Sequence, residues 1–315
     1  MTLVIAGYEH SKSMDYSDLA EDHSITYTPK MEPDGLFVVA DSAITSHAGG
    51  RTLLNGFRKI HRLEAKLWKP YFQPNGSFSG YREVYETRPL FVAFAGSTLT
   101  AQHILNSITT HLSELRISCE KEYVNDAIQY NVIRSCQKNP LSPEGTPVEW
   151  DNNTFLNRDF ERLLTGEVIA KTIEYSINDA LQSASRYKLS MDEFNAMHTE
   201  LVSGVWCPVS KRHELYVYRM ASKPGDDEAL VAYTQKELVP ETEVAVLGMR
   251  KMFESLAQHE FSKAMLSFTS PAYAMFDFLN NAIDQVKNSG SKEIDKPMTL
   301  WCLKEQSLTR KKYLK

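Results

Sequence analysis

The sequence predicts an α+β fold in which two β-sheets lie between two layers of helices. Three observations point to this class. Short apolar runs occupy the first third of the 315 residues, amphipathic helical stripes follow, and strand and helix patterns return towards the C-terminus. Each of these elements has an apolar face, and two sheets between helical layers would bury all of the faces in one core. We therefore expect a single domain over residues 1–315.

The N-terminal strands are predicted from short apolar runs that are rich in β-branched and aromatic residues. Gly, Pro, Asn and Asp separate these runs. The runs over 36–40 and 91–95 are continuous rather than alternating, which is typical of strands that are covered on both faces. The four predicted strands are Thr2–Tyr8, Gly35–Asp41, Arg58–Leu63 and Leu90–Ala95.

Helical spacing of apolar residues predicts a helix over Thr98–Leu115 and another over 168–181. The polar segment 139–157 between them contains three prolines and predicts an insertion loop. The rest of the chain predicts strands at 201–206, 214–219, 229–233, 244–247 and 298–303, helices over 251–257 and 273–286, and a basic tail at Arg310–Lys312.

The composition argues against several classes of function. A net charge of -5 and a pI near 6.0 lack the basic excess of a nucleic-acid-binding protein. No apolar run reaches the roughly 18 residues that span a bilayer, and no secretory signal is present, so we expect a cytoplasmic protein without membrane contact. The Cys and His spacings predict no metal site, and no cofactor is expected. Because nucleotide-binding glycine motifs are absent, energy-dependent unfolding of a substrate would need a separate ATPase.

Four segments of the first third carry candidate chemistry. They are residues 2–6 (TLVIA), 35–42 (GLFVVADS), 58–63 (RKIHRL) and 93–98 (AFAGST). Together they resemble proteasome β subunits and the bacterial HslV-like and Anbu-like proteasome-related peptidases. Those families open with a Thr-led strand and continue with a VVAADS-like strand, a KKV.RL-like strand and a GFAGS-like turn into a helix. The resemblance implies the four-layer αββα sandwich of N-terminal-nucleophile (Ntn) hydrolases, with two antiparallel sheets.

Thr2 is the candidate nucleophile. A threonine hydroxyl needs a base, and removal of Met1 would give Thr2 a free amine that titrates near neutrality and can take that proton. Lys59 would stabilise the alkoxide and is, by resemblance, the catalytic lysine. Asp41 ends an apolar strand, where a carboxylate needs a partner, and pairing with Lys59 would keep that lysine charged. The alternatives are that Thr2 is merely the first residue of a strand, that Lys59 is a solvated strand lysine, and that Asp41 belongs to a turn at the end of its strand.

Gly96 is the candidate oxyanion hole, because its N–H follows an apolar strand and precedes a helix. The alternative is a simple turn. The resemblance makes Thr45 the residue whose backbone pairs with bound peptide, so that Ala43 to Thr45, together with Gly96, would line the substrate cleft.

Some positions depart from the family pattern. Extra residues near 9–34, 64–89 and 118–165 predict insertions. Met249 stands where the family has the serine of a Gly-Ser-Gly turn, which helps to position the nucleophile. Asp284 and Ser289 are the nearest candidates for the supporting Asp and Ser of the family.

The function expected from these residues is that of a threonine peptidase. It would cleave amide bonds in a peptide or protein substrate, within a ring-like homo-oligomer. The alternative is a non-catalytic proteasome-like subunit with a structural or binding role. The substitution at Met249 favours this alternative, whereas the joint presence of Thr2, Asp41 and Lys59 favours the enzyme.

Overall fold

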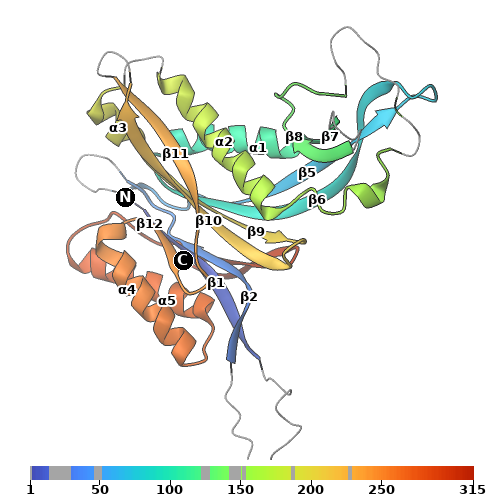
Figure 1. The fold of residues 1–315 in the computed structure, drawn as a ribbon. Helices are drawn as coiled ribbons and strands as arrows, with labels where there is room; N and C mark the ends of the chain where they lie inside the picture. The colour runs from blue at the N-terminus through green and yellow to red at the C-terminus, as the bar shows by residue number, and fades with distance from the viewer. Residues whose placement is uncertain are drawn as a thin grey trace, which may run out of the picture.

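A computed structural model describes residues 2–13, 30–45, 52–121, 128–141, 150, 154–185, 189–225 and 229–315. Within these residues, two large sheets and four long helices make a mixed α+β fold, as predicted (Figure 1). Met1 and parts of the insertions that we expect near 9–34 and 118–165 lie outside the described residues.

The first sheet has five strands and is antiparallel throughout. The first strand of the chain lies between two other strands of this sheet, which places the beginning of the chain in the interior of the molecule. The order across the sheet is β12 (Val244–Gly248), β1 (Leu3–Ser13), β2 (Lys30–Ala40), β13 (Met298–Lys304) and β14 (Ser307–Leu314).

The second sheet has seven strands, and the β5–β7 contact is parallel, so the expectation of two purely antiparallel sheets was wrong at this pair. The other pairs of the sheet are antiparallel. The order is β11 (Leu230–Leu238), β10 (Arg212–Pro224), β9 (Thr199–Cys207), β6 (Phe78–Gly96), β5 (Ile60–Phe72), β7 (Leu115–Lys121) and β8 (Ile128–Ile133).

Three buried clusters hold the layers together. One lies between the seven-stranded sheet and the helices α1 (Thr98–Ser113) and α2 (Gly166–Ser185). The second lies between the five-stranded sheet and the helices α4 (Arg250–Leu266) and α5 (Pro271–Asn288). The third contains residues of both sheets and fills the space between them. Figure 1 shows the two helix pairs on opposite sides of the sheets.

Alternation along β1 explains why its sequence is continuously apolar. Leu3 and Ile5 belong to the cluster under α4 and α5, whereas Val4 and Ala6 belong to the cluster between the sheets. All four side chains are fully buried. A strand with both faces covered needs an apolar residue at every position, and β1 meets this condition over these four residues.

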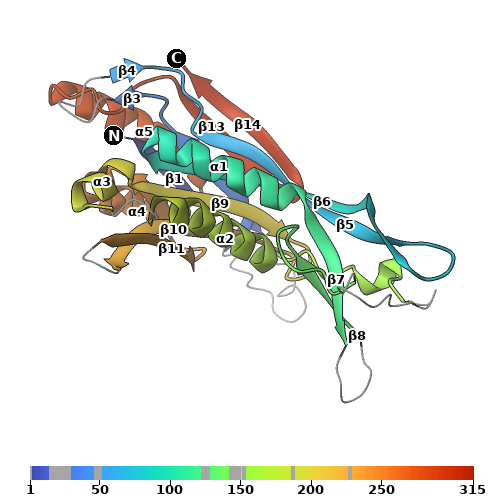
Figure 2. The same cartoon turned by 90° about the horizontal axis from the view of Figure 1, so that it is seen from above.

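The predicted insertion near 64–89 is a long β-hairpin made by β5 and β6. Figure 2 shows this hairpin, with β7 and β8, extending beyond the ends of α1 and α2. Aromatic residues stabilise the extension: the rings of Phe72 and Phe155 lie 4.9 Å apart, and Trp150 packs against both. The Trp150 amide also donates to the Gly76 carbonyl at 3.0 Å, which fixes the hairpin turn.

The structure corrects the sequence prediction in several places. The prediction of a basic tail was wrong, because Arg310–Lys312 lies in β14. This is an edge strand, and charged side chains are typical of the edge of a sheet. Also not predicted from the sequence were the strands β7 and β8, the short hairpin of β3 (Ile44–Thr45) and β4 (Thr52–Leu54), and the short helix α3 (Met191–Met197). Among the described helices, none has the length and apolar character needed to cross a membrane.

Candidate active site

Thr2 lies immediately before β1, and its neighbours fix its backbone. The residue is 6 % exposed. Its carbonyl accepts a hydrogen bond from the amide of Met249 at 3.0 Å. The amide of Leu3, the next residue, donates to the Asp41 carboxylate at 2.9 Å. Thr2 is therefore held from two other segments of the chain.

Two strand ends bring Asp41 and Lys59 to Thr2. Asp41 directly follows β2, whose last residue, Ala40, pairs with Val4 of β1. Lys59 directly precedes β5, and its carbonyl accepts the Phe94 amide of β6 at 3.2 Å. The sheet registers thus place a carboxylate and an ammonium group beside the start of the chain.

The three side chains form a compact polar cluster. The Lys59 Nζ atom lies 2.9 Å from both Asp41 oxygens and 2.9 Å from Thr2 Oγ1. The Asp41 side chain is 0 % exposed and that of Lys59 is 2 % exposed. Asp41 also accepts the amide of Ala43 at 3.0 Å, so that its oxygens are fully used. A buried charge pair is tolerated when its members are paired and hydrogen-bonded in this way.

Burial lowers the pKa of the Lys59 ammonium, and the adjacent Asp41 carboxylate opposes this shift. The arrangement places an N–H donor of Lys59 on the hydroxyl oxygen of Thr2. Such a donor stabilises negative charge that develops on the oxygen, most strongly where water is excluded.

Gly96 ends β6, at the junction with α1. Its φ of +116° belongs to a region that favours glycine, and a Cβ atom would lie 2.2 Å from the His198 carbonyl oxygen. The following amide, of Ser97, donates to the same carbonyl at 2.9 Å. The residue type at position 96 therefore follows from close backbone packing, and Gly96 itself is exposed.

Of the predicted substrate-binding residues, Ala43 contacts the cluster through its amide, and Thr45 lies two residues further along the chain in β3. Ala43 is buried and Thr45 is half-buried in the β3–β4 hairpin. A hollow of about 650 Å³ borders this hairpin and the segment after α5. Its lining includes Leu54, Asn55 and Asp295, and the Asp295 carbonyl accepts the amide of Ser42 at 3.4 Å, which links the hollow to the Asp41 loop.

The structure does not bring Asp284 and Ser289 into the polar cluster. Both side chains are exposed at the end of α5, and the Ser289 hydroxyl donates to the Val286 carbonyl at 2.7 Å. Among the described residues, no group of three or more His, Cys, Asp or Glu side chains could hold a metal ion. The four cysteines, all within the described residues, form no disulfide bond.

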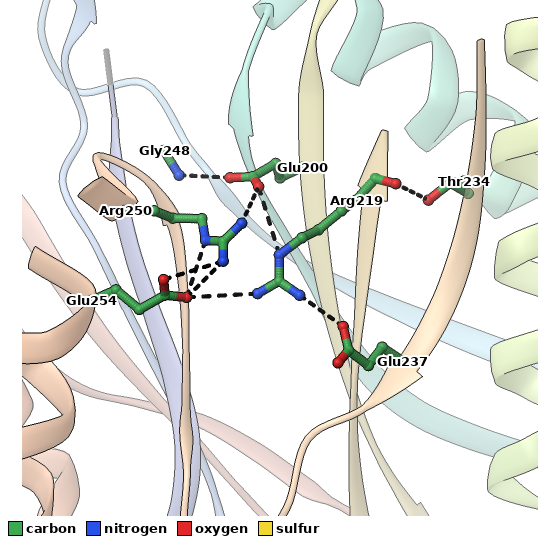
Figure 3. A network of polar contacts seen from close by, with 7 residues as sticks. All are labelled: Glu200, Arg219, Thr234, Glu237, Gly248, Arg250 and Glu254. Carbon is green, nitrogen blue, oxygen red and sulfur yellow. Dashed lines mark hydrogen bonds and ion pairs between the residues drawn. The ribbon is translucent and has the colours of Figure 1, made fainter. Parts of the chain in front are cut away.

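Two residues of the site were not predicted. Gly248, with φ +85°, packs so closely that a Cβ atom would lie 2.0 Å from the Thr2 carbonyl oxygen. Glu200 accepts the amide of Gly248 at 2.9 Å (Figure 3). A carboxylate directly before the apolar run 201–206 was the available signal for Glu200, the same kind of signal that marked Asp41 after its strand.

Met249 contributes its backbone to the site and its side chain to the core. The side chain is 6 % exposed and packs in the cluster under α4 and α5. The residue precedes α4 as its N-cap and makes no side-chain capping bond there. The hydrogen bond to Thr2 therefore comes from the amide at position 249 and needs no hydroxyl.

No protein-family model matches the sequence, and no curated protein matches it. Among solved structures, similarity is found to an Anbu (Gly-1) mutant from Hyphomicrobium sp. strain MC1, with a TM-score of 0.43, 12% identity, and 99% of this chain and 87% of that chain covered. Anbu (ancestral beta-subunit) from Yersinia bercovieri gives a TM-score of 0.43 and 13% identity, over 98% and 86% of the two chains. Likenesses of this degree do not establish the family of this chain.

Proposed function

We propose that this chain is a proteasome-like Ntn hydrolase with the four-layer αββα sandwich, and that it acts as a threonine peptidase. The observation that carries the proposal is the contact of 2.9 Å between Lys59 Nζ and Thr2 Oγ1, in a cluster that Asp41 completes. A strand-end threonine with a purely structural role would not require a buried ammonium group on its hydroxyl.

The proposed reaction uses the free amine of Thr2 after loss of Met1. The amine takes the proton of the Thr2 hydroxyl as Oγ1 attacks the carbonyl carbon of an amide bond. The tetrahedral intermediate collapses, the amide C–N bond breaks, and the leaving amine receives the proton. Water then hydrolyses the ester on Thr2 and releases the acid. Lys59 stabilises Oγ1 while it carries negative charge, and Asp41 keeps Lys59 in place.

The neighbouring residues suit a peptide or protein substrate. An extended peptide that pairs with the backbone of Thr45 in β3 would run past Ala43 towards Thr2. The Gly96 N–H would hold the carbonyl oxygen of the scissile bond, as an oxyanion hole does. These roles, like those of the cluster, are part of the proposal.

A non-catalytic subunit is the second candidate, and one observation favours it. The Met249 side chain lies in the apolar core, so that position 249 offers Thr2 no hydroxyl. The same fold could then serve assembly or binding, with the Lys59–Asp41 pair holding β2 and β5 together.

Labelling with a threonine-directed electrophile separates the two candidates. Intact mass of protein made in cells should show loss of Met1, and an epoxyketone or β-lactone should then add once to wild type. Thr2→Ala removes the nucleophile, and Lys59→Ala removes the stabilising charge, which we expect to lower the labelling rate roughly a hundredfold or more. Lys263→Ala, which removes an exposed lysine of α4, is the matched control.

Two outcomes would reject the enzyme. One is complete retention of Met1, which leaves the base tied up in an amide. The other is wild type with a free Thr2 amine that is never labelled and cleaves no peptide of a broad library. If Lys59→Ala labels as fast as wild type, the role of Lys59 is rejected while the nucleophile remains.

Assembly is the remaining part of the proposal. We expect a ring-like homo-oligomer in the cytoplasm, with any unfolding of substrates supplied by a separate ATPase. Light scattering after size-exclusion chromatography should give a multiple of the 35.9 kDa chain mass. A 35.9 kDa species at all working concentrations would contradict it.

A further inference from the structure

Glu200 is a buried carboxylate that the proposed reaction does not use. It lies in β9, where it pairs with Ala95, the residue before Gly96. Its side chain is 8 % exposed. One oxygen accepts the Gly248 amide at 2.9 Å, and the other lies 3.8 Å from Arg219 Nε and 3.7 Å from Arg250 Nη1 (Figure 3).

The residue that Glu200 holds is in direct contact with Thr2. Gly248 pairs with Leu3 in the sheet, and its Cα faces the Thr2 carbonyl so closely that a side chain has no room there. The next amide, of Met249, donates to the same carbonyl at 3.0 Å. The position of the β12–α4 junction therefore determines where the backbone of Thr2 lies.

The two arginines fix the Glu200 carboxylate from different parts of the fold. Arg219 belongs to β10 of the seven-stranded sheet, and Arg250 is the first residue of α4. Glu254 of α4 binds Arg250 at 2.9 Å, and Glu237 of β11 binds Arg219 at 2.9 Å. Each guanidinium is thus oriented by an outer carboxylate, which leaves Glu200 little freedom to move.

We propose that Glu200 is a positioning residue for Thr2: it fixes the Gly248 amide, and through the Gly248–Met249 backbone it sets the place of the nucleophile. This inference rests on the proposed function. It also accounts for the absence of a hydroxyl at position 249, because the backbone that Glu200 fixes does the positioning. Misplacement of a reacting atom by about 1 Å is enough to slow a reaction on the order of a hundredfold.

The test compares variants of two buried carboxylates. Glu200→Ala removes the acceptor, whereas Glu200→Gln keeps an oxygen that can accept the Gly248 amide. Glu9→Ala is the matched control: Glu9 lies towards the far end of β1, is 8 % exposed, and likewise accepts a backbone amide, that of Ala272 at 2.8 Å. Each protein is labelled with a β-lactone, and the maximal rate of labelling is separated from the concentration that gives half of this rate.

We expect Glu200→Ala to lower the maximal labelling rate about tenfold or more, with the half-saturating concentration unchanged. Glu200→Gln should recover most of the rate, and Glu9→Ala should label like wild type. A Glu200→Ala protein that labels at the wild-type rate would overturn the proposal. So would a loss in Glu9→Ala as large as that in Glu200→Ala, or a Gln variant as slow as the Ala variant.

Hydrogen exchange gives a readout that does not depend on catalysis. The amides of Gly248 and Met249 should exchange faster in Glu200→Ala than in wild type, because the acceptor of the Gly248 amide is lost. In Glu9→Ala this acceptor is still present, and their exchange rates should equal those of wild type. If wild type is never labelled, the proposed function fails while this measurement still decides whether Glu200 holds the junction. Unchanged exchange in Glu200→Ala counts against Glu200 in either case. Where the Ala variant does not fold, Glu200→Met, which also lacks an acceptor for the Gly248 amide, is measured in its place, and unchanged exchange there counts against Glu200 equally.

Discussion

The two ends of β1 both bury charge, but they use it differently. At the Thr2 end, the Asp41 carboxylate faces an ammonium group that also contacts a hydroxyl. Towards the other end, Glu9 accepts the Ala272 amide at the start of α5, and no cation lies within ion-pair distance of it among the described residues. Carboxylates that accept helix N-terminal amides are common structural features. A buried charge therefore indicates chemistry when its partners include a reactive group.

The largest expected difference between the two ends comes from removing the negative charge. Asp41→Asn leaves the Lys59 ammonium buried without a counter-ion, which should lower the free energy of unfolding by about 3–5 kcal/mol. It should also abolish labelling of Thr2. The measurement is urea unfolding of wild type and variant, followed by labelling of the folded fraction. Glu9→Gln is the control, and a loss of stability as large as that of Asp41→Asn would remove the distinction between the ends.

The second prediction sharpens the comparison at the Thr2 end. Gly248→Ala introduces a Cβ atom 2.0 Å from the Thr2 carbonyl oxygen at φ +85°, and should cost about 1–3 kcal/mol in backbone strain and slow the labelling of Thr2. Gly290→Ala is the matched control, because its φ is +83° and its Cβ would meet nothing within 4 Å. It should cost about 1 kcal/mol and leave labelling unchanged. Equal labelling rates in the two variants would show that the contact does not position Thr2.

The smallest effect is expected at Glu9, as a change in the pH dependence of stability. Burial raises the pKa of the Glu9 carboxyl above its ordinary value of 4.5, against the opposing hydrogen bonds of Ser270 and Ala272. The folded state therefore binds the proton more tightly than the unfolded state does. Stability is highest below pH 4.5 as far as this group is concerned, and falls as the pH rises through the folded-state pKa.

Glu9→Gln keeps an acceptor for Ala272 but cannot ionise, so this contribution to the fall should disappear. Urea unfolding of both proteins over a pH series measures it as a difference between the two curves. Parallel curves would show that Glu9 carries no such penalty, and would contradict the inference that burial raises the pKa of its carboxyl.

Much of the fold could be predicted because its elements are strongly patterned. The doubly buried strands over 36–40 and 91–95 and the amphipathic helix from Thr98 are where the sequence indicated them. β14 was missed because an edge strand carries charges that read as a solvated tail. Whether the chain forms one domain stays a prediction.

The residues of the candidate site likewise divide into those that the sequence predicted and those that it did not. Thr2, Asp41, Lys59 and Gly96 lie at strand ends, where a polar residue or a glycine borders a predicted strand and is visible in the sequence. Glu200 also stands next to an apolar run, but its partner is the backbone amide of Gly248, and no residue type in the sequence marks a backbone partner. Asp284 and Ser289 were chosen by their nearness to an expected register; both are exposed, Asp284 in α5 and Ser289 directly after it, because nearness in sequence does not fix which residue faces a site.

The pairing of β1 with β12 has a consequence for the order of events during synthesis. Leu3 lies opposite Gly248, so the first strand to be made has to wait for nearly four-fifths of the chain before its second edge is covered. Contacts of such large sequence separation form late and slowly. The surroundings of Thr2 are therefore assembled among the last parts of the molecule, and a nascent or truncated chain that ends before Gly248 would lack the backbone that contacts Thr2. Under the proposed function, this delay would keep Thr2 from reacting before most of the chain has been made.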